Sequence, residues 1–148
     1  MITRRALEGL ARTQKLSIGN AEKDYLLDII LQSISHHQQK NLIFKGGTCL
    51  YKFHHLPRFS EDLDFSALKI IDINEFTQKI TKDLERKGVY ATEHTRKEPH
   101  NSVLLTLRIK GPLVTYSPSK REEPLASSTE LPVPSPQALI RLCPSLSL

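Results

Sequence analysis

Cysteine is scarce in this sequence, and long hydrophobic runs are missing. The two cysteines, Cys49 and Cys143, form no Cys-x-x-Cys pair, which excludes a zinc ribbon and a disulfide scaffold. No run of about 18 apolar residues is present, so a transmembrane helix is not expected. Residues 1–15 carry basic side chains but lack the apolar stretch of a secretory signal. We therefore expect a cytoplasmic protein with free thiols and no membrane association.

The overall composition of the chain is typical of one globular domain. A chain of 148 residues can bury a sizeable core but leaves little room for a second domain. Hydrophobic residues make up 39% of the chain and charged residues 25%, which are the proportions of a folded protein. The net charge of +5 favours an anionic partner such as a nucleotide or RNA. A folded protein with a modest positive charge and no such partner is an equally good interpretation of the charge alone.

Proline divides the chain into two parts of different character. Seven of the nine prolines lie between Pro112 and Pro144, and the charges within 117–148 cancel. The net positive charge therefore belongs to residues 1–116. Because proline at this density interrupts helices and central strands, we expect a folded core over 1–116 and a Pro/Ser-rich, irregular or disordered tail over 117–148.

The hydrophobic pattern of residues 1–116 alternates between helical and strand periods. Apolar residues at helical spacing predict a long helix over 21–38, capped by Asn20, and another over 74–87. Shorter elements are predicted in between and beyond, namely a strand at 42–44, a helix at 48–54, a strand around 62–65, and strands at 89–91 and 102–109. This interleaving predicts an α/β or α+β fold with a small mixed sheet.

A glycine pair follows the first predicted strand. Gly46 and Gly47 let the backbone come close to a ligand, and the helix that follows presents free N–H groups beside the Thr48 hydroxyl. Such a turn can cradle phosphate oxygens. It is not a P-loop, because Tyr51-Lys52-Phe53 stands where that motif requires glycine, lysine and a hydroxyl residue. The alternative is an ordinary glycine turn before a helix.

Two carboxylates lie two residues apart on the next predicted strand. Asp62 and Asp64 point to one face of that strand, while Leu63 and Phe65 point to the other. Mg²⁺ is commonly held by one or two carboxylates together with substrate phosphates. The alternative is a solvated strand face. Only 13 residues separate Thr48 from Asp62, so the phosphate cradle and the carboxylate pair are expected to lie side by side.

The segment that contains both features, FKGGTCLYKFHHLPRFSEDLDF, resembles a known family. A Gly-Gly turn followed by Asp-x-Asp is similar to the signature of the nucleotidyltransferase superfamily that includes DNA polymerase β. The segment more closely resembles the AbiEii/AbiGii toxin nucleotidyltransferases. This resemblance is carried by two motifs, Lys-Gly-Gly-Thr-x-Leu and Arg-x-Ser-x-Asp-Leu-Asp-Phe. The resemblance extends over roughly residues 1–112.

This resemblance implies a fold, an activity and partners. The fold would be a polymerase β-like nucleotidyltransferase core, with a small mixed sheet flanked by helices. The activity would be Mg²⁺-dependent transfer of a nucleotide from an NTP to an acceptor, for which tRNA is the favoured candidate. The biological role would be the toxin of a toxin–antitoxin or phage abortive-infection system, with a cognate antitoxin as a possible partner.

The resemblance also implies roles for single residues. Asp62 and Asp64 would bind Mg²⁺ as catalytic residues, and Ser60 would contact phosphate or position the two carboxylates. The residues expected to bind the nucleotide are Lys45, Gly46, Gly47, Thr48 and Arg58. Surface charge is the alternative for Lys45 and Arg58, and a turn hydroxyl is the alternative for Ser60.

The chain departs from the family toward its C-terminus. Family members continue with a further lysine and a third acidic residue on later strands, whereas the resemblance here fades around Lys110-Gly111-Pro112. The chain therefore resembles a family member truncated at its C-terminus. The alternative to an active enzyme is a catalytically impaired, nucleotide-binding remnant that lacks the third acidic residue.

Overall fold

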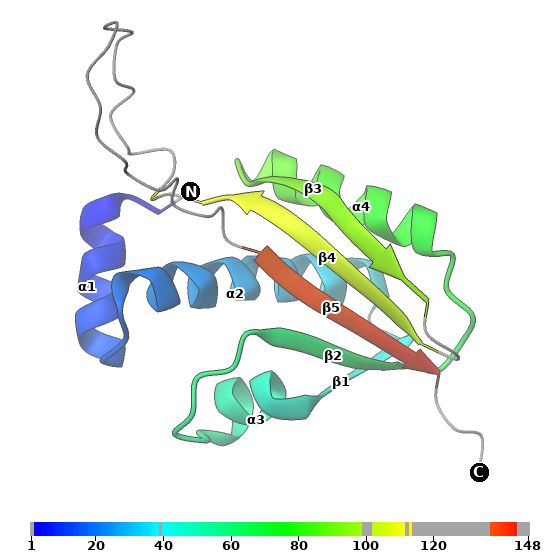
Figure 1. The fold of residues 1–148 in the computed structure, drawn as a ribbon, viewed down its shortest axis with the longest axis horizontal. Helices are drawn as coiled ribbons and strands as arrows, with labels where there is room; N and C mark the ends of the chain where they lie inside the picture. Colours follow the sequence, from blue (N-terminus) through cyan, green and yellow to red (C-terminus); the bar gives the residue numbers. More distant parts are fainter. Residues whose placement is uncertain (1, 39, 99–101, 112, 114–136, 145–148) are drawn as a thin grey trace, which may run out of the picture.

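A computed structural model describes residues 2–38, 40–98, 102–111, 113 and 137–144 of the chain. Within these ranges the helices and strands form one continuous arrangement, drawn in Figure 1. In chain order they are α1 (Arg4–Gln14), α2 (Ile18–Gln38), β1 (Leu42–Lys45), α3 (Gly46–His54), β2 (Asp62–Ala67), α4 (Ile73–Arg86), β3 (Tyr90–Lys97), β4 (Val103–Lys110) and β5 (Gln137–Pro144).

The strands form a mixed sheet in the order β1-β2-β5-β4-β3. Strands β2 and β5 are parallel, and the other neighbouring pairs are antiparallel. The last strand in the chain thus lies in the middle of the sheet, where Figure 1 draws it between β2 and β4. The predicted α/β class with a small mixed sheet is confirmed.

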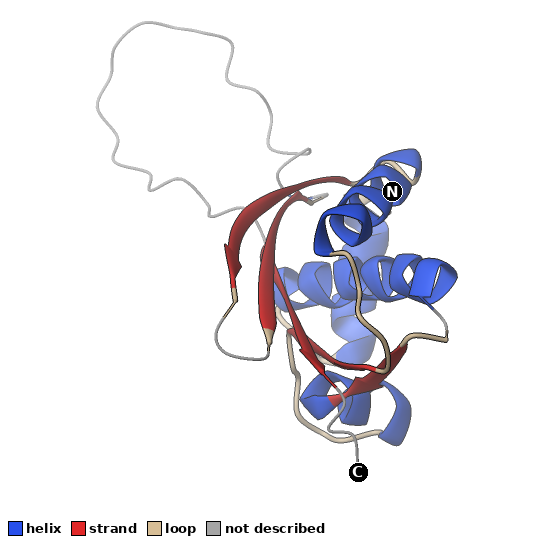
Figure 2. Ribbon diagram, turned by 90° about the vertical axis from the view of Figure 1, so that its right-hand side faces the viewer, coloured by secondary structure: helices blue, strands red, loops and turns tan. Residues whose placement is uncertain are grey.

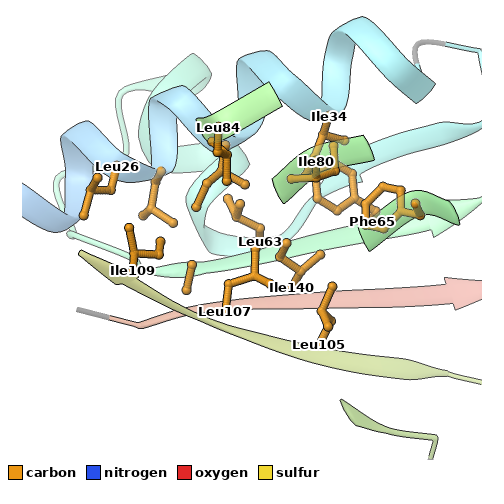
Figure 3. Packing of buried hydrophobic residues seen from close by; sticks show 14 of the residues in the cluster. Leu26, Ile34, Leu63, Phe65, Ile80, Leu84, Leu105, Leu107, Ile109 and Ile140 are labelled. Carbon is orange, nitrogen blue, oxygen red and sulfur yellow. The ribbon is translucent and has the colours of Figure 1, made fainter. Parts of the chain in front are cut away.

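One face of the sheet carries the hydrophobic core. Alternate residues of β2, β4 and β5 supply buried side chains that pack with those of α2 and α4, as Figure 3 shows. Figure 2 shows the long helices on one side of the curved sheet, and no described helix covers the other side. The core residues from the strands are Leu63, Phe65, Leu105, Leu107, Ile109, Ala138, Ile140 and Leu142.

The prediction of an irregular tail is wrong for residues 137–144, which form β5. In β5, buried Ala138, Ile140 and Leu142 alternate with more exposed residues, as expected of a strand with one dry face. Prolines flank this run, and a proline is tolerated at the end of a strand. The folded core is therefore not confined to 1–116, while residues 114–136 and 145–148 lie outside the described residues.

The long helix α2 begins earlier than its apolar pattern predicts. Its first residue is Ile18, and the hydroxyl of Ser17 accepts a hydrogen bond from the backbone N–H of Asn20 at 3.2 Å. Ser17 rather than Asn20 therefore caps the helix. None of the helices in the described part of the chain combines the length and the apolar character needed to span a bilayer.

A buried carboxylate joins α2 to the segment that follows β4. The Glu22 side chain accepts a hydrogen bond from the backbone N–H of Leu113 at 2.6 Å, and Glu22 is only 5% exposed. Burial raises the pKa of Glu22, and the hydrogen bond from Leu113 opposes this effect only in part. The charged form of Glu22 is thus less favourable in the folded chain than in the unfolded one.

Replacing Glu22 by glutamine is expected to flatten the pH dependence of stability. A raised pKa in the folded state gives stability that is present below the ordinary value of 4.5 and lost as the pH rises through the folded value. Glutamine keeps an acceptor for Leu113 without the charge, so the stability of the variant relative to wild type should rise as the pH is raised from 4 to 8. Urea unfolding at both pH values measures this gain, and a constant difference would contradict it.

Candidate active site

The glycine turn forms the junction between β1 and α3. Strand β1 ends at Lys45, and the helix begins at Gly46, which has a φ of 79°. Glycine adopts this left-handed region without the penalty that a Cβ brings. The side chain of Lys45 makes no capping hydrogen bond, so it leaves the first N–H groups of α3 to other acceptors. A helix terminus of this kind favours anions such as phosphate.

The two carboxylates lie on the first part of β2. Asp62 and Asp64 are half-buried and lie on the face of the sheet opposite the helices, whereas Leu63 and Phe65 are buried in the core. The anchoring that the sequence predicts for this strand is therefore present. It holds both carboxylates on one face of a rigid element.

The turn and the carboxylate pair are in contact. A Cβ atom added to Gly46 would collide with the carboxylate of Asp64 and would lie 3.0 Å from its Cβ. Only a residue without a side chain fits here, and the start of α3 therefore approaches Asp64 directly. The expected juxtaposition of the glycine turn and the carboxylate pair is present in the fold.

Thr48 and Ser60 connect the helix to the strand. The Thr48 side chain is fully buried, and its hydroxyl donates a hydrogen bond to the carbonyl oxygen of Asp62 at 2.5 Å. It also lies 2.9 Å from the Ser60 hydroxyl. The Thr48 side chain therefore faces the protein rather than a ligand, and it positions the start of β2. Ser60 packs against the turn, 3.0 Å from where a Cβ of Gly47 would lie.

The two basic residues that are predicted to bind the nucleotide lie in different positions relative to the carboxylates. Lys45 is exposed and pairs in register with Asp64 across β1 and β2, so the fold brings it to the carboxylates. Arg58 is exposed in the loop before β2, and within the described residues its side chain has no hydrogen bond or ion pair. The structure thus does not bring Arg58 against the carboxylate pair.

Sequence reasoning missed a buried ion-pair network that fixes α3 on α2. The Lys52 ammonium lies 2.7 Å from Asp24 and 2.6 Å from Asp28, and Asp24 also accepts a hydrogen bond from Gln14 at 3.1 Å. Burial lowers the pKa of Lys52, but hydrogen bonds to the two carboxylates outweigh it and leave the pKa above its ordinary value. Burial and the nearby Asp24 charge raise the pKa of Tyr51. The spacing of Asp24 and Asp28, one helical turn apart, places two carboxylates on one face of α2 but does not identify Lys52 as their partner.

A second missed residue is Arg141 on β5. It pairs in register with Asp64 across the parallel strands, and one guanidinium nitrogen lies 3.5 Å from an Asp64 oxygen. No signal in the sequence pointed to it, because its strand lies in the predicted irregular tail.

The donor set near the turn suits a cation that is shared with a ligand. Among the described residues, no group of three or more His, Cys, Asp or Glu side chains could hold a metal ion. Asp62 and Asp64 supply hard oxygen ligands, and Mg²⁺ is often bound by one or two carboxylates with substrate phosphates completing its coordination. The residues present therefore fit a metal that binds together with a nucleotide.

Replacing Gly46 by alanine is expected to impair the site more than the fold. A left-handed φ costs an L-residue about 1–2 kcal/mol, and the added methyl group would displace the Asp64 carboxylate. Gly88, with a φ of 75° and open space around it, provides the matched control. We expect Gly88→Ala to lower stability in urea unfolding but to preserve nucleotide binding, which Gly46→Ala should lose. Equal nucleotide affinity in both variants would contradict this prediction.

One comparison with known proteins identifies a family. A family model described as nucleotidyl transferase AbiEii toxin, type IV toxin–antitoxin system, matches residues 29–131, whereas no curated protein matches the sequence.

Two crystal structures from Helicobacter pylori have a similar fold. One is assigned as a nucleotidyltransferase, with a TM-score of 0.58 and 19% identity over 86% of this chain. The other, JHP933, has a TM-score of 0.55 and 18% identity over 88% of this chain. The match spans 46% of the length of each. Because the family model covers more than half of the sequence, the chain belongs to the AbiEii family of nucleotidyl transferase toxins of type IV toxin–antitoxin systems.

Proposed function

We propose that the chain binds a nucleoside triphosphate at the start of α3 and transfers its nucleotide to a hydroxyl of an acceptor, with tRNA as the favoured acceptor. The single observation that carries this proposal is the contact between the Gly46 turn and the Asp64 carboxylate. A phosphate held by the first N–H groups of α3 would lie beside the carboxylate pair.

Each residue near the turn has a role in this proposal. The N–H groups at the start of α3 and the Lys45 charge bind the triphosphate, and Arg58 adds positive charge from the loop before β2. Asp62 and Asp64 hold Mg²⁺, which would lower the pKa of the attacking hydroxyl and stabilise the leaving oxygen. Thr48 and Ser60 fix the start of β2 relative to the turn.

The transfer forms one bond and breaks one bond. The acceptor hydroxyl oxygen bonds to the α-phosphorus, and the bond from that phosphorus to the pyrophosphate oxygen breaks. The hydroxyl proton leaves to solvent or to a carboxylate, and pyrophosphate carries the negative charge away. Catalysis of this kind depends mostly on positioning and on stabilisation of charge.

The acceptor and the biological context are part of the proposal. The net charge of +5 suits binding of a polyanion such as tRNA, whose phosphates dominate the affinity. Membership of a toxin family supports a role as the toxic component, with a cognate antitoxin as partner. An acceptor tRNA would place this activity in the cytoplasm.

A second candidate function is nucleotide binding without transfer. The observation that favours it is Arg141, because the strand parallel to β2 presents a guanidinium rather than a third carboxylate beside Asp64. If no third acid joins Asp62 and Asp64, as among the residues that the structure describes, activation of the acceptor hydroxyl would be weaker.

One experiment separates the two candidates. The full chain is incubated with each labelled NTP, Mg²⁺ and total tRNA, and label in the tRNA is measured with and without a chelator. In parallel, binding of a fluorescent NTP analogue is titrated. Chelator-sensitive label transfer supports the enzyme, and binding without transfer supports the second candidate. If neither is observed, both proposals are wrong.

A further inference from the structure

Asp64 has a cation on each neighbouring strand, whereas Asp62 has none. Lys45 on β1 and Arg141 on β5 both pair in register with Asp64. Asp62 pairs with Leu139 on β5, and β1 ends before it can pair with Asp62. The two carboxylates are therefore electrostatically different, although the sequence pattern treats them alike.

The contact between Arg141 and Asp64 is loose. The distance of 3.5 Å exceeds the usual 2.7–2.9 Å of a charge-assisted hydrogen bond. The Arg141 side chain is 45% exposed, and within the described part of the chain it has no second ion pair. Its remaining N–H donors can reach a new acceptor, and a guanidinium matches phosphate oxygens in a bidentate geometry.

We propose that Arg141 is an exchangeable counter-ion of Asp64, held by the carboxylate in the free chain and transferred to a phosphate of the bound nucleotide. This inference rests on the proposed function, in which Asp62 and Asp64 hold the divalent ion. While Arg141 pairs with Asp64, its positive charge opposes a divalent ion at the same oxygen. Once a nucleotide is bound, its phosphates attract the guanidinium and free Asp64 for the metal.

Binding of metal and nucleotide should then be coupled through this residue. In the free chain, Arg141 lowers the affinity for the ion, and in the nucleotide complex it raises the affinity for phosphate. A tethered cation that competes at one ligand thus makes the site prefer a metal–nucleotide complex to a bare metal ion.

The test uses Mn²⁺ as a spectroscopic substitute for Mg²⁺. Mn²⁺ binding to the full chain is titrated by electron paramagnetic resonance without nucleotide, for wild type, Arg141→Gln and Arg141→Lys. We expect Arg141→Gln to bind Mn²⁺ about threefold to tenfold more tightly than wild type. For a non-hydrolysable NTP analogue the order of affinities is reversed. Arg141→Gln should bind this analogue about fivefold more weakly than wild type. Arg141→Lys should stay within about twofold of wild type in Mn²⁺ binding.

Two further variants keep the outcomes distinct. Arg108→Gln removes an exposed arginine from the same face of the sheet, where Arg108 pairs in register with Gln137, and it should leave Mn²⁺ affinity unchanged. Asp64→Asn tests the proposed function itself. If Asp64→Asn weakens Mn²⁺ binding but Arg141→Gln equals wild type, the role of Arg141 is wrong and the metal site stands. If Asp64→Asn has no effect, or no variant binds Mn²⁺, both are wrong. Urea unfolding confirms that each variant is folded.

Discussion

Replacing Asp62 by asparagine is expected to reduce nucleotide transfer at least about a hundredfold while the protein keeps its fold. The amide keeps the size of the side chain but removes the charge that holds the divalent ion. The strand stays anchored by Leu63 and Phe65, which are buried on the opposite face. The label-transfer assay measures the loss, and Mg²⁺-dependent binding of an NTP analogue provides a second measurement that does not require turnover.

Asp64→Asn should remove transfer equally but should affect stability differently. Asp62 has no cation in register on either neighbouring strand, so Asp62→Asn mainly relieves repulsion between the two carboxylates. Asp64→Asn instead leaves Arg141 without its counter-ion and removes the negative charge that lies in register with Lys45 on β1. Without metal, we therefore expect Asp62→Asn to be as stable as wild type or more stable, and Asp64→Asn to lose up to about 1 kcal/mol.

Glu61→Gln is the matched control for both variants. Glu61 is the acid next to Asp62 in the chain, but its exposed side chain pairs with Lys23 on α2 and lies outside the proposed site. Its replacement should leave transfer within about twofold of wild type. Wild-type transfer in either aspartate variant would show that the carboxylate pair is not the catalytic centre.

Most elements before Lys110 could be predicted because their patterns are local, but β3 extends to Lys97, well beyond the predicted 89–91, because most of its residues are exposed and show no alternation. In α4, Phe76, Ile80 and Leu84 recur at intervals of four residues, and all three are buried against the sheet. In β2, Leu63 and Phe65 alternate with the two carboxylates. A period of this kind depends only on near neighbours, so it is visible without knowledge of the tertiary fold.

Strand β5 could not be predicted from the same rule with equal ease. Its alternation of Ala138, Ile140 and Leu142 is real but short, and it lies within a proline-rich stretch. What stabilises β5 is tertiary, because its buried residues complete the core and its backbone pairs with β2 on one side and β4 on the other. Composition reveals the prolines, but it does not reveal that the sheet has a place for a strand between β2 and β4.

The contacts in the site also differ in how far they could be predicted, depending on whether they join neighbouring or distant segments of the chain. The sequence predicted that the Gly46 turn meets Asp64, because one short helix and a loop connect them. It could not predict Arg141 beside Asp64 or Lys52 beside Asp24, since each pair joins distant segments that only the folded sheet and helices bring together. Thr48 was predicted to hold phosphate, but its hydroxyl is turned inward to the Asp62 carbonyl oxygen.

Replacing Lys52 by methionine is expected to destabilise the protein by about 3 kcal/mol. The lysine side chain is only 10% exposed, and it neutralises Asp24, which is 3% exposed. Methionine fills a similar volume but leaves Asp24 as a buried charge without a counter-ion. Asp28 contributes less to the loss, because its side chain is 59% exposed and water can solvate it.

Two variants separate this buried pair from an ordinary surface contact. Lys23 also pairs with an acid, Glu61, but both side chains are substantially exposed, so Lys23→Met should cost less than about 1 kcal/mol. Adding Asp24→Asn to Lys52→Met removes the stranded charge, and the double variant should regain more than half of the lost stability. Strictly additive losses would contradict a direct interaction between Lys52 and Asp24.

The same substitution should weaken the proposed nucleotide site from a distance. Lys52 holds α3 against α2, and the first N–H groups of α3 form the proposed phosphate site, so a less firmly held α3 would position that site less well. Because the raised pKa of Lys52 lies above its ordinary value of 10.5, the lysine stays charged at neutral pH, and its contribution is lost only in strong alkali. Urea unfolding at pH 7 and pH 9 should therefore give the same difference between wild type and Lys52→Met. A difference that disappears between these values would mean that the lysine is neutral in the folded protein.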